Sequence, residues 1–253
     1  MDDMDKPLVS IITVVLNGER HIESAIQSVI NQTYKNIEYI ILDGQSEDNT
    51  IDIIKKYENY ISFFESKKDN GLYEAINRGI ELSKGSFIKI LNSDDMLDPI
   101  AIEENLKVFE EEGGSNSFVV NSYLKRIDLN GNFLSIWKNK GKIINGYDQF
   151  LHPTWLVPKA IYDKFGYYDE SYKVSSDYEY YLRLKFNDVL FKTIKHPLVM
   201  FRVAGLSYGL KGMKEDLEIN LKYTNIFSSY WHYYKNTILK VLKSIKDKLL
   251  GND

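Results

Sequence analysis

Buried apolar runs alternate with helix-period segments over the first 100 residues of this chain. Residues 8–16 (LVSIITVVL) form a nearly continuous run rich in β-branched side chains, which predicts a strand buried on both faces, as in a parallel sheet. Residues 22–30 then place apolar side chains three and four positions apart, the spacing of an amphipathic helix. The pattern continues through residues 37–42, 51–57, 61–65, 72–82 and 86–91. It predicts an open parallel sheet with right-handed crossovers and helices on both faces.

The sequence pattern changes after residue 115. Two apolar runs flank Asn130-Gly131, which is a hairpin signal. Further helices are predicted at 159–165 and 177–186, and further strands at 189–194 and 198–203. We therefore predict one domain over residues 1–212, with a parallel half over about 1–115 and a mixed half over about 116–212. Residues 213–253 are predicted to form a helical, amphipathic C-terminal extension, because lysines oppose an apolar face in the pattern of residues 238–249.

Composition excludes several classes of function. The chain has no cysteine, which excludes disulfides, thiolate metal sites and a cysteine nucleophile. Its formal net charge is −4, which argues against nucleic acid as a partner. No apolar run approaches the roughly 18 residues that a membrane span needs, and the acidic start MDDMDKP lacks the features of a signal peptide. These observations favour a cytoplasmic location.

Polar side chains follow four of the predicted strands at the point where each strand ends. They are Asn17, Asp43, Asp69 and the pair Asp94-Asp95. Ligands of open parallel sheets bind at the carboxyl ends of the strands. The sequence therefore predicts a ligand site at this edge.

Two of these groups suggest particular chemistry. Asp43 could accept hydrogen bonds from a ribose or a nucleobase, although its segment (DGQSEDNT) equally fits a turn and helix cap. Asp94 and Asp95 repel each other unless a hard divalent cation neutralises them, but a helix cap is the alternative because Asp98-Pro99 follows. The chain has neither a Gly-x-Gly-x-x-Gly nor a Walker motif. A metal at Asp94/Asp95 would be the natural substitute for holding phosphate.

Two further residues lie in the second half. Asp177 begins a predicted helix (DYEYYLRL), where a carboxylate is either a cap or a general base. His152 is one of four histidines and has no second histidine at metal spacing, so a structural role is its simpler interpretation.

The order and spacing of three segments resemble the family-2 inverting glycosyltransferases with the GT-A fold. They are VSIITVVLNGERHIESAIQSVINQTYKNIEYIILDGQSEDNT, KDNGLYEAINRGIELSKGSFIKILNSDD and FGYYDESYKVSSDYEYYLRL. The resemblance runs from about Leu8 to about Ser207. It implies an α/β, Rossmann-like fold with a mostly parallel sheet flanked by helices, a nucleotide-sugar half and a mixed acceptor-side half.

The resemblance also assigns roles on the donor side. It predicts that the nucleotide-sugar binds to four regions: the first nucleotide-binding loop, the uracil or ribose contact, the donor-sugar segment and the Asp-x-Asp region. The residues of these regions are Thr13, Val15, Asn17, Glu19, Asp43, Asp69, Asn77, Arg78, Asn92, Ser93 and Asp94. Asp94 and Asp95 would hold Mn²⁺ or Mg²⁺. The first position of the Asp-x-Asp motif is Asn92 here, which makes Asp94 the favoured ligand.

On the other side of the reaction, Asp177 aligns with the catalytic base of the family. Many members have Glu-Asp at this point, whereas this chain has Ser176-Asp177. Three residues would lie on the acceptor side: His152, Trp155 and Tyr178. For any one aromatic residue, core packing is the alternative to stacking on a sugar.

The implied function is transfer of a hexose or N-acetylhexosamine, with inversion, from a nucleotide-sugar, expected to be UDP-linked, to a glycan. A lipid-linked oligosaccharide is the expected acceptor, in the synthesis of a surface polysaccharide such as O-antigen. The C-terminal helix could then contact the inner face of the membrane, or dock on the domain or a partner chain.

Two other functions remain possible from the sequence. A nucleotidyltransferase would need a Gly-rich, basic first loop, and Asn17-Gly18-Glu19-Arg20 supplies one glycine and one basic residue. A non-catalytic carbohydrate-binding relative is the second, although the intact Asp43, Asp94 and Asp177 argue against it.

Overall fold

The computed structural model describes residues 6–138, 151–203, 210–224, 226 and 234. The amphipathic helix predicted over 238–249 lies outside these residues. Among the described residues, no helix is both long enough and apolar enough to cross a bilayer.

A five-stranded sheet forms the first half, in the order β3-β2-β1-β4-β8. Its strands are β1 (Val9–Val15), β2 (Ile37–Asp43), β3 (Phe63–Ser66), β4 (Phe87–Ile90) and β8 (Val157–Pro158). The first four are parallel to their neighbours, and β8 pairs antiparallel with β4. The predicted parallel arrangement is confirmed.

A second, four-stranded sheet has the order β5-β9-β6-β7. Its strands are β5 (Met96–Leu97), β6 (Phe118–Ile127), β7 (Phe133–Trp137) and β9 (Leu190–Arg202). Strands β6 and β9 are parallel, whereas β7 and β5 pair antiparallel. The mixed second half is therefore confirmed, with one difference. The two strands predicted at 189–194 and 198–203 form the single strand β9, because register shifts in its pairing with β6 accommodate Pro197.

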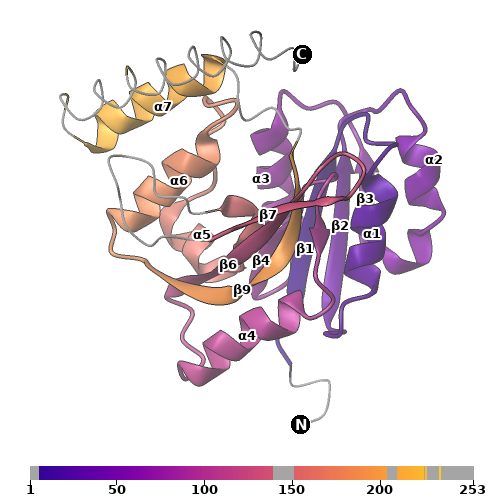
Figure 1. The fold of residues 1–253 in the computed structure, drawn as a ribbon, viewed down its shortest axis with the longest axis horizontal. Helices are drawn as coiled ribbons and strands as arrows, with labels where there is room; N and C mark the ends of the chain where they lie inside the picture. The colour runs from indigo at the N-terminus through magenta and orange to yellow at the C-terminus, as the bar shows by residue number, and fades with distance from the viewer. Residues whose placement is uncertain (1–5, 139–150, 204–209, 225, 227–233, 235–253) are drawn as a thin grey trace.

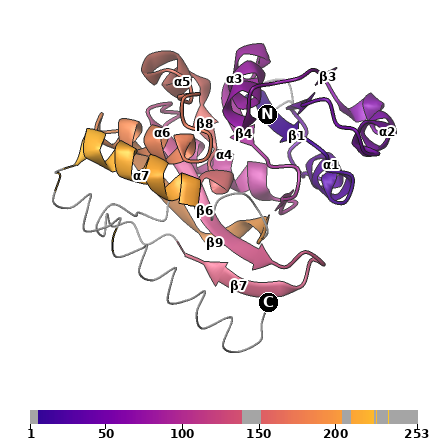
Figure 2. The same cartoon turned by 90° about the horizontal axis from the view of Figure 1, so that it is seen from above.

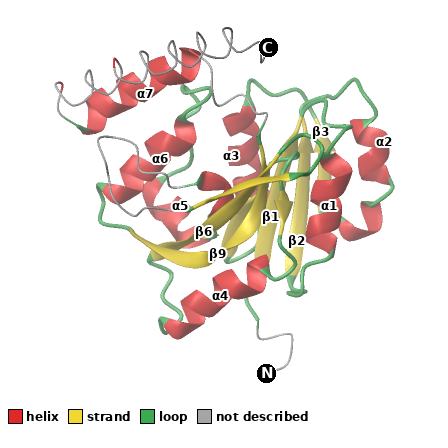
Figure 3. Cartoon of the chain, viewed as in Figure 1, coloured by secondary structure: helices red, strands yellow, loops and turns green. Residues whose placement is uncertain are grey.

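Helices cover both faces of the first sheet (Figures 1 and 3). The described helices are α1 (Ile22–Ile30), α2 (Thr50–Lys55), α3 (Leu72–Leu82), α4 (Ala101–Glu111), α5 (Lys159–Phe165), α6 (Ser176–Lys185) and α7 (Leu210–Tyr223), with short 3₁₀ turns at Glu58–Tyr60 and His152–Thr154. Helix α7 packs on α6 and not on the sheet. Seen from above, α1 and α3 lie on opposite sides of β1 (Figure 2).

The core consists of two clusters, one on each face of the first sheet. Ile11 and Ile41 face the cluster that includes α1 and α4, whereas Ile12 and Ile40 face the one that includes α3, α5 and α6. Every residue of β1 is buried, which explains why its sequence is a continuous apolar run rather than an alternating one.

Candidate active site

Strands β1, β2 and β3 end level with one another, and β4 ends three residues earlier, opposite Ile12. Val15 pairs with Asp43, and Asp43 pairs with Ser66. On the other side of β1, Ile12 pairs with Ile90, the last residue of β4. The loops that follow these strands therefore start from the same edge, as the sequence predicted.

The loops after β1 and β2 are joined by hydrogen bonds. The Asn17 side chain accepts the Glu47 backbone N–H at 2.9 Å. The Glu19 carboxylate accepts both the backbone and side-chain N–H of Asn49, at 3.0 and 2.7 Å. Asn17 has a left-handed backbone conformation with φ of 51°, which asparagine tolerates. Asn17 and Glu19 thus shape this edge through contacts within the protein.

Asp43 is fully buried and already has several hydrogen-bond donors. Its carboxylate accepts the Ser46 backbone N–H at 3.0 Å, the Ser46 hydroxyl at 2.5 Å and the Ser66 hydroxyl at 2.6 Å. Asp69 lies close by, since a methyl group on Gly44 would come within 3.0 Å of an Asp69 carboxylate oxygen. In this structure Asp43 therefore organises the turns after β2 and β3 and does not face solvent.

Arg78 projects from α3 toward β3. Its Nε lies 3.2 Å from the Glu65 carboxylate. Its Nη2 is buried and has no hydrogen-bond partner. A guanidinium with an unused donor beside Glu65 of β3 is a candidate contact for an acceptor group of a ligand.

Three predicted donor-site residues belong to the scaffold instead. Thr13 is fully buried and shares a hydrogen bond of 3.1 Å with the Tyr39 hydroxyl, and Val15 is buried in the sheet. Asn77 is buried, and its amide bonds Glu170 and both backbone groups of Tyr168. The side chains of Thr13 and Val15 thus pack within the sheet, and their place in the donor site stays a prediction.

The paired aspartates after β4 have different surroundings. Asp95 is fully buried, and its carboxylate accepts the Asn92 amide at 3.0 Å and the Arg202 backbone N–H at 2.9 Å. Asp94 is half-buried, and no other described residue donates a hydrogen bond to its carboxylate. Burial raises the pKa of both carboxyl groups, and the charge of Asp94 raises the pKa of Asp95 further. Ser93 lies beside Gly18 of the first loop.

Arg202, which the sequence analysis missed, holds this turn in place. Its guanidinium donates to the backbone carbonyls of Asp94, Asp128 and Leu129 at 3.0–3.1 Å. Arg202 ends β9, and the short strand β5 pairs with β9 directly after Asp95. The only sequence signal for this role was an arginine at the end of an apolar run.

The donor set fits a cation held mainly by Asp94. No group of three or more histidine, aspartate or glutamate side chains among the described residues could by itself hold a metal ion. Mg²⁺ and Mn²⁺ sites of one or two carboxylates are completed by water and phosphate oxygens. Asp94 offers one such carboxylate, whereas Asp95 is occupied by Asn92 and Arg202, so the expectation of a second direct ligand is not supported.

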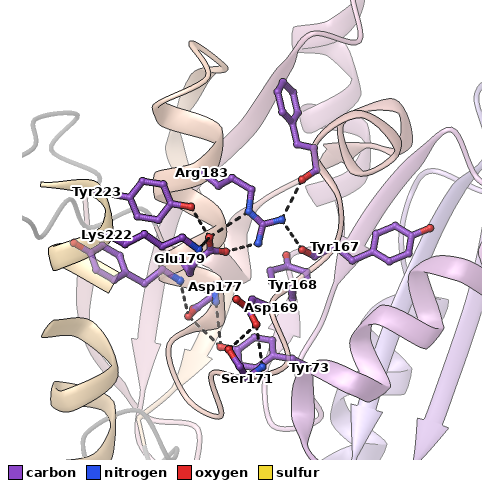
Figure 4. A network of polar contacts seen from close by, with 12 residues as sticks. Tyr73, Tyr167, Tyr168, Asp169, Ser171, Asp177, Glu179, Arg183, Lys222 and Tyr223 are labelled. Carbon is purple, nitrogen blue, oxygen red and sulfur yellow. Dashed lines mark hydrogen bonds and ion pairs between the residues drawn. The ribbon is translucent and has the colours of Figure 1, made fainter. Parts of the chain in front are cut away.

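Asp177 lies at the first turn of α6, beside α3 (Figure 4). One carboxylate oxygen accepts the Tyr73 hydroxyl at 3.1 Å and the Tyr178 backbone N–H at 2.9 Å. Burial raises the pKa of Asp177, and the hydrogen bond from Tyr73 opposes this shift. The Tyr73 hydroxyl also lies 2.9 Å from the Val174 carbonyl, so its single proton can serve either oxygen.

The turn before α6 contacts the loop after β3. The Lys173 ammonium donates to the Asn70 carbonyl at 3.3 Å. The turn that precedes Asp177 therefore lies beside the loop after β3, which carries Asp69. No hydrogen bond among the described residues joins Asp94 directly to Asp177.

The residues predicted for the acceptor side pack inward. His152 bonds the Tyr168 hydroxyl at 2.7 Å, and burial lowers the pKa of His152 to about 3. Trp155 is only 2% exposed and belongs to the core cluster on the α3 side. Tyr178 is half-buried and donates to Asn220 of α7 at 2.8 Å. Core packing, the alternative left open for the aromatic residues, describes Trp155 best.

The model of glycosyl transferase family 2 matches residues 10–173. This chain belongs to that family. The match includes every strand-end residue of the candidate donor site and ends before Asp177. The two sheets and their covering helices are those of a GT-A glycosyltransferase, as expected from the sequence.

Named relatives agree with this assignment. The uncharacterized glycosyltransferase MJ1057 of Methanocaldococcus jannaschii is 29% identical over 97% of this chain and 96% of its own length. The uncharacterized glycosyltransferase RT0329 of Rickettsia typhi is 33% identical over 73% of this chain. The matched part of this chain covers 61% of the length of RT0329.

Solved structures share the fold. The TarS fragment 1–349 of S. aureus, in complex with UDP-GlcNAc, has a TM-score of 0.69 at 18% identity, over 84% of this chain and 64% of the other. The mannosyltransferase PcManGT of Pyrobaculum calidifontis, in complex with GDP-Man and Mn²⁺, has a TM-score of 0.66 at 12% identity, over 87% of this chain and 65% of the other.

Proposed function

We propose that this glycosyltransferase moves a sugar from a nucleoside diphosphate, with inversion, to a hydroxyl group of a glycan, using Mn²⁺ or Mg²⁺. The observation that carries the proposal is the position of Asp177. Its carboxylate is partly desolvated at the start of α6, and the turn before α6 contacts the loop after β3. A carboxylate whose pKa is raised by burial is a stronger base than a solvated one.

Asp177 would accept the proton of the acceptor hydroxyl as that oxygen attacks the anomeric carbon. The new C–O bond forms on the face opposite the diphosphate, and the bond to the diphosphate breaks with its electron pair on the leaving oxygen. One displacement of this kind inverts the anomeric centre. The Tyr73 hydroxyl would donate its hydrogen bond to the ionised Asp177 carboxylate and so orient it. Once Asp177 is protonated, the same hydroxyl would donate to the Val174 carbonyl instead.

Asp94 would hold the cation, because its carboxylate is free of the contacts that occupy Asp95. A bound cation supplies Lewis-acid stabilisation of the departing diphosphate. Arg202 fixes the backbone of the Asp94 turn from β9. The complex of PcManGT with GDP-Man and Mn²⁺ supports this proposal.

The nucleotide would lie along the turns after β1, β2 and β3. Arg78 and Asp69 are its candidate direct contacts, since Arg78 retains unused donors and Asp69 is half-buried beside Gly44. Asp43 would act by fixing Ser46 and Ser66 around it. A UDP-linked donor is supported by the complex of TarS with UDP-GlcNAc.

The acceptor proposal rests on the sequence resemblance. A lipid-linked oligosaccharide on the route to a surface polysaccharide remains our proposed acceptor, and peripheral contact with the inner membrane face remains the proposed role of residues 235–253. His152 reaches the Asp177 region through Tyr168, which stacks on Tyr73, and Tyr178 follows Asp177 directly in α6.

The direct test is release of UDP or GDP from UDP-N-acetylglucosamine, UDP-glucose and GDP-mannose in the presence of Mn²⁺. We expect Asp177→Asn to lower turnover about 10²–10⁴-fold while UDP affinity, measured by calorimetry, changes less than about twofold, because the amide cannot accept the proton.

Asp188→Asn is the matched control, since Asp188 is exposed beyond the other end of α6. Unchanged turnover of Asp177→Asn would remove Asp177 from the role of base. Wild-type enzyme that binds UDP but turns over none of the three donors would favour the non-catalytic relative.

A further inference from the structure

Helix α7 packs against α6 and lies beyond the segment that the family model matches (Figures 1 and 2). Three residues of α7 that contact α6 or its entry turn are buried: Glu215, Ile219 and Asn220. The contacts of this helix therefore concern the element that carries Asp177.

Glu215 binds the backbone immediately before α6. One carboxylate oxygen accepts the Lys173 N–H at 3.0 Å, and the other accepts the N–H groups of Val174 and Ser175 at 2.8 and 2.9 Å. Glu215 is only 8% exposed, so these charge-assisted bonds are shielded from water and are strong for their kind.

The entry turn of α6 has no equivalent support from its own sequence. Ser175 occupies the N-cap position, but its side chain makes no capping hydrogen bond and lies 3.4 Å from the Gly212 carbonyl of α7. Helix starts need acceptors for their free N–H groups and favour nearby negative charge. Glu215 supplies the negative charge and an acceptor for the N–H of the N-cap residue Ser175, from a helix about 40 residues further along the chain.

Two more contacts tie α7 to the residues that follow Asp177. The Tyr178 hydroxyl donates to Asn220 at 2.8 Å. Glu179 is fully buried and is bound by Arg183 of its own helix and by Lys222 and Tyr223 of α7 (Figure 4). Helix α7 thus holds the chain on both sides of Asp177. Glu215 binds the backbone before it, and Asn220, Lys222 and Tyr223 bind the side chains of the two residues after it.

We propose that Glu215 is a positioning residue for the catalytic base, and that α7 is an integral part of the active site rather than an accessory extension. The inference rests on the proposed role of Asp177. Without the Glu215 carboxylate, three N–H groups lose their acceptor and the turn that aims Asp177 loosens, while the donor side, built from the loops after β1 to β4, is unchanged. A displacement of about 1 Å at a reacting group can cost about 10²-fold in rate.

The test compares Glu215→Gln with Glu218→Gln, since Glu218 is exposed on the same helix. Turnover is measured on the fastest of the three nucleotide-sugars and divided by the number of UDP-binding sites from calorimetry, which corrects for any misfolded fraction. We expect Glu215→Gln to lower turnover per site at least tenfold, with donor KM within about twofold of wild type. Glu218→Gln should match wild type.

A second measurement does not depend on activity. Hydrogen exchange of the segment 172–178 should become at least tenfold faster in Glu215→Gln, with no change in α1. Unchanged exchange, or turnover per site equal to wild type, would overturn the proposal. A loss of activity wholly explained by fewer UDP-binding sites would also overturn it, because the role would then be in folding alone.

If Glu215→Gln does not fold, Tyr223→Phe carries the test, since it removes one hydroxyl from Glu179. We expect turnover per site about threefold lower with donor KM unchanged, and wild-type turnover would contradict the proposal. Failure of the proposed function has a different signature: Asp177→Asn would then be as active as wild type, whatever the Glu215 variants do.

Discussion

At the scale of single residues, Asp177 and Asp95 are each held by a hydrogen bond from a residue about 100 positions away in the sequence. The sequence placed a carboxylate at the start of a helix at Asp177 and offered both a cap and a base as its role. It gave no sign of Tyr73, because the hydrogen bond between them spans 104 residues. Likewise, the Asp94-Asp95 pair was visible, but its division into a half-buried Asp94 and a buried, fully occupied Asp95 depends on Arg202 of β9.

Tyr73→Phe tests this partnership. The hydrogen bond from Tyr73 favours the ionised form of Asp177 and so lowers its pKa. Losing it raises that pKa, and the base becomes active only at higher pH. A hydrogen bond to a charged group is worth about 1.5–3 kcal/mol, so we expect the acid limb of the kcat–pH profile to move up by about one to two pH units.

Tyr60→Phe is the control for this profile, since Tyr60 is 61% exposed in the turn after α2. An acid limb at the same pH in Tyr73→Phe and wild type would show that Tyr73 does not act on the titrating base.

At the scale of elements, periodicity predicted the strands and helices of the first half, because β1 is buried on both faces and α1 on one. It failed at β9, where Pro197 looked like a strand end but is accommodated by shifted register. It also treated residues 213–253 as a separate extension, although α7 begins at Leu210 and bonds to α6. Long-range side-chain contacts of this kind leave no local pattern.

Gly85→Ala tests how closely the β4 entry packs on β1. A methyl group at Gly85 would lie 2.5 Å from the Ser10 backbone nitrogen and 2.8 Å from the Leu8 carbonyl, and neither backbone atom can move aside without disturbing the sheet. We expect the free energy of unfolding in urea to fall by about 1–3 kcal/mol.

Lys84→Ala, at the exposed neighbouring position, should change that free energy by less than about 0.5 kcal/mol. An equal effect of the two substitutions would contradict the packing account.

At the scale of the whole molecule, two sheets cooperate at one edge. The four parallel strands deliver the loops of the donor side, and the second sheet reaches the Asp94 turn through β5 and Arg202. Helix α6 carries Asp177, which is supported by Tyr73 of α3 and Glu215 of α7, and the turn before α6 contacts the loop after β3. In our proposal, carboxylates far apart in sequence serve a single reaction, with Asp94 binding the diphosphate through a cation and Asp177 accepting the proton.

Calorimetric titration of UDP, with and without Mn²⁺, into wild type, Asp94→Ala and Asp177→Asn tests this separation of duties. We predict that wild type and Asp177→Asn bind UDP at least tenfold more tightly with Mn²⁺ than without it, and that Asp94→Ala loses this dependence. Manganese-dependent binding of equal strength in all three proteins would contradict the account.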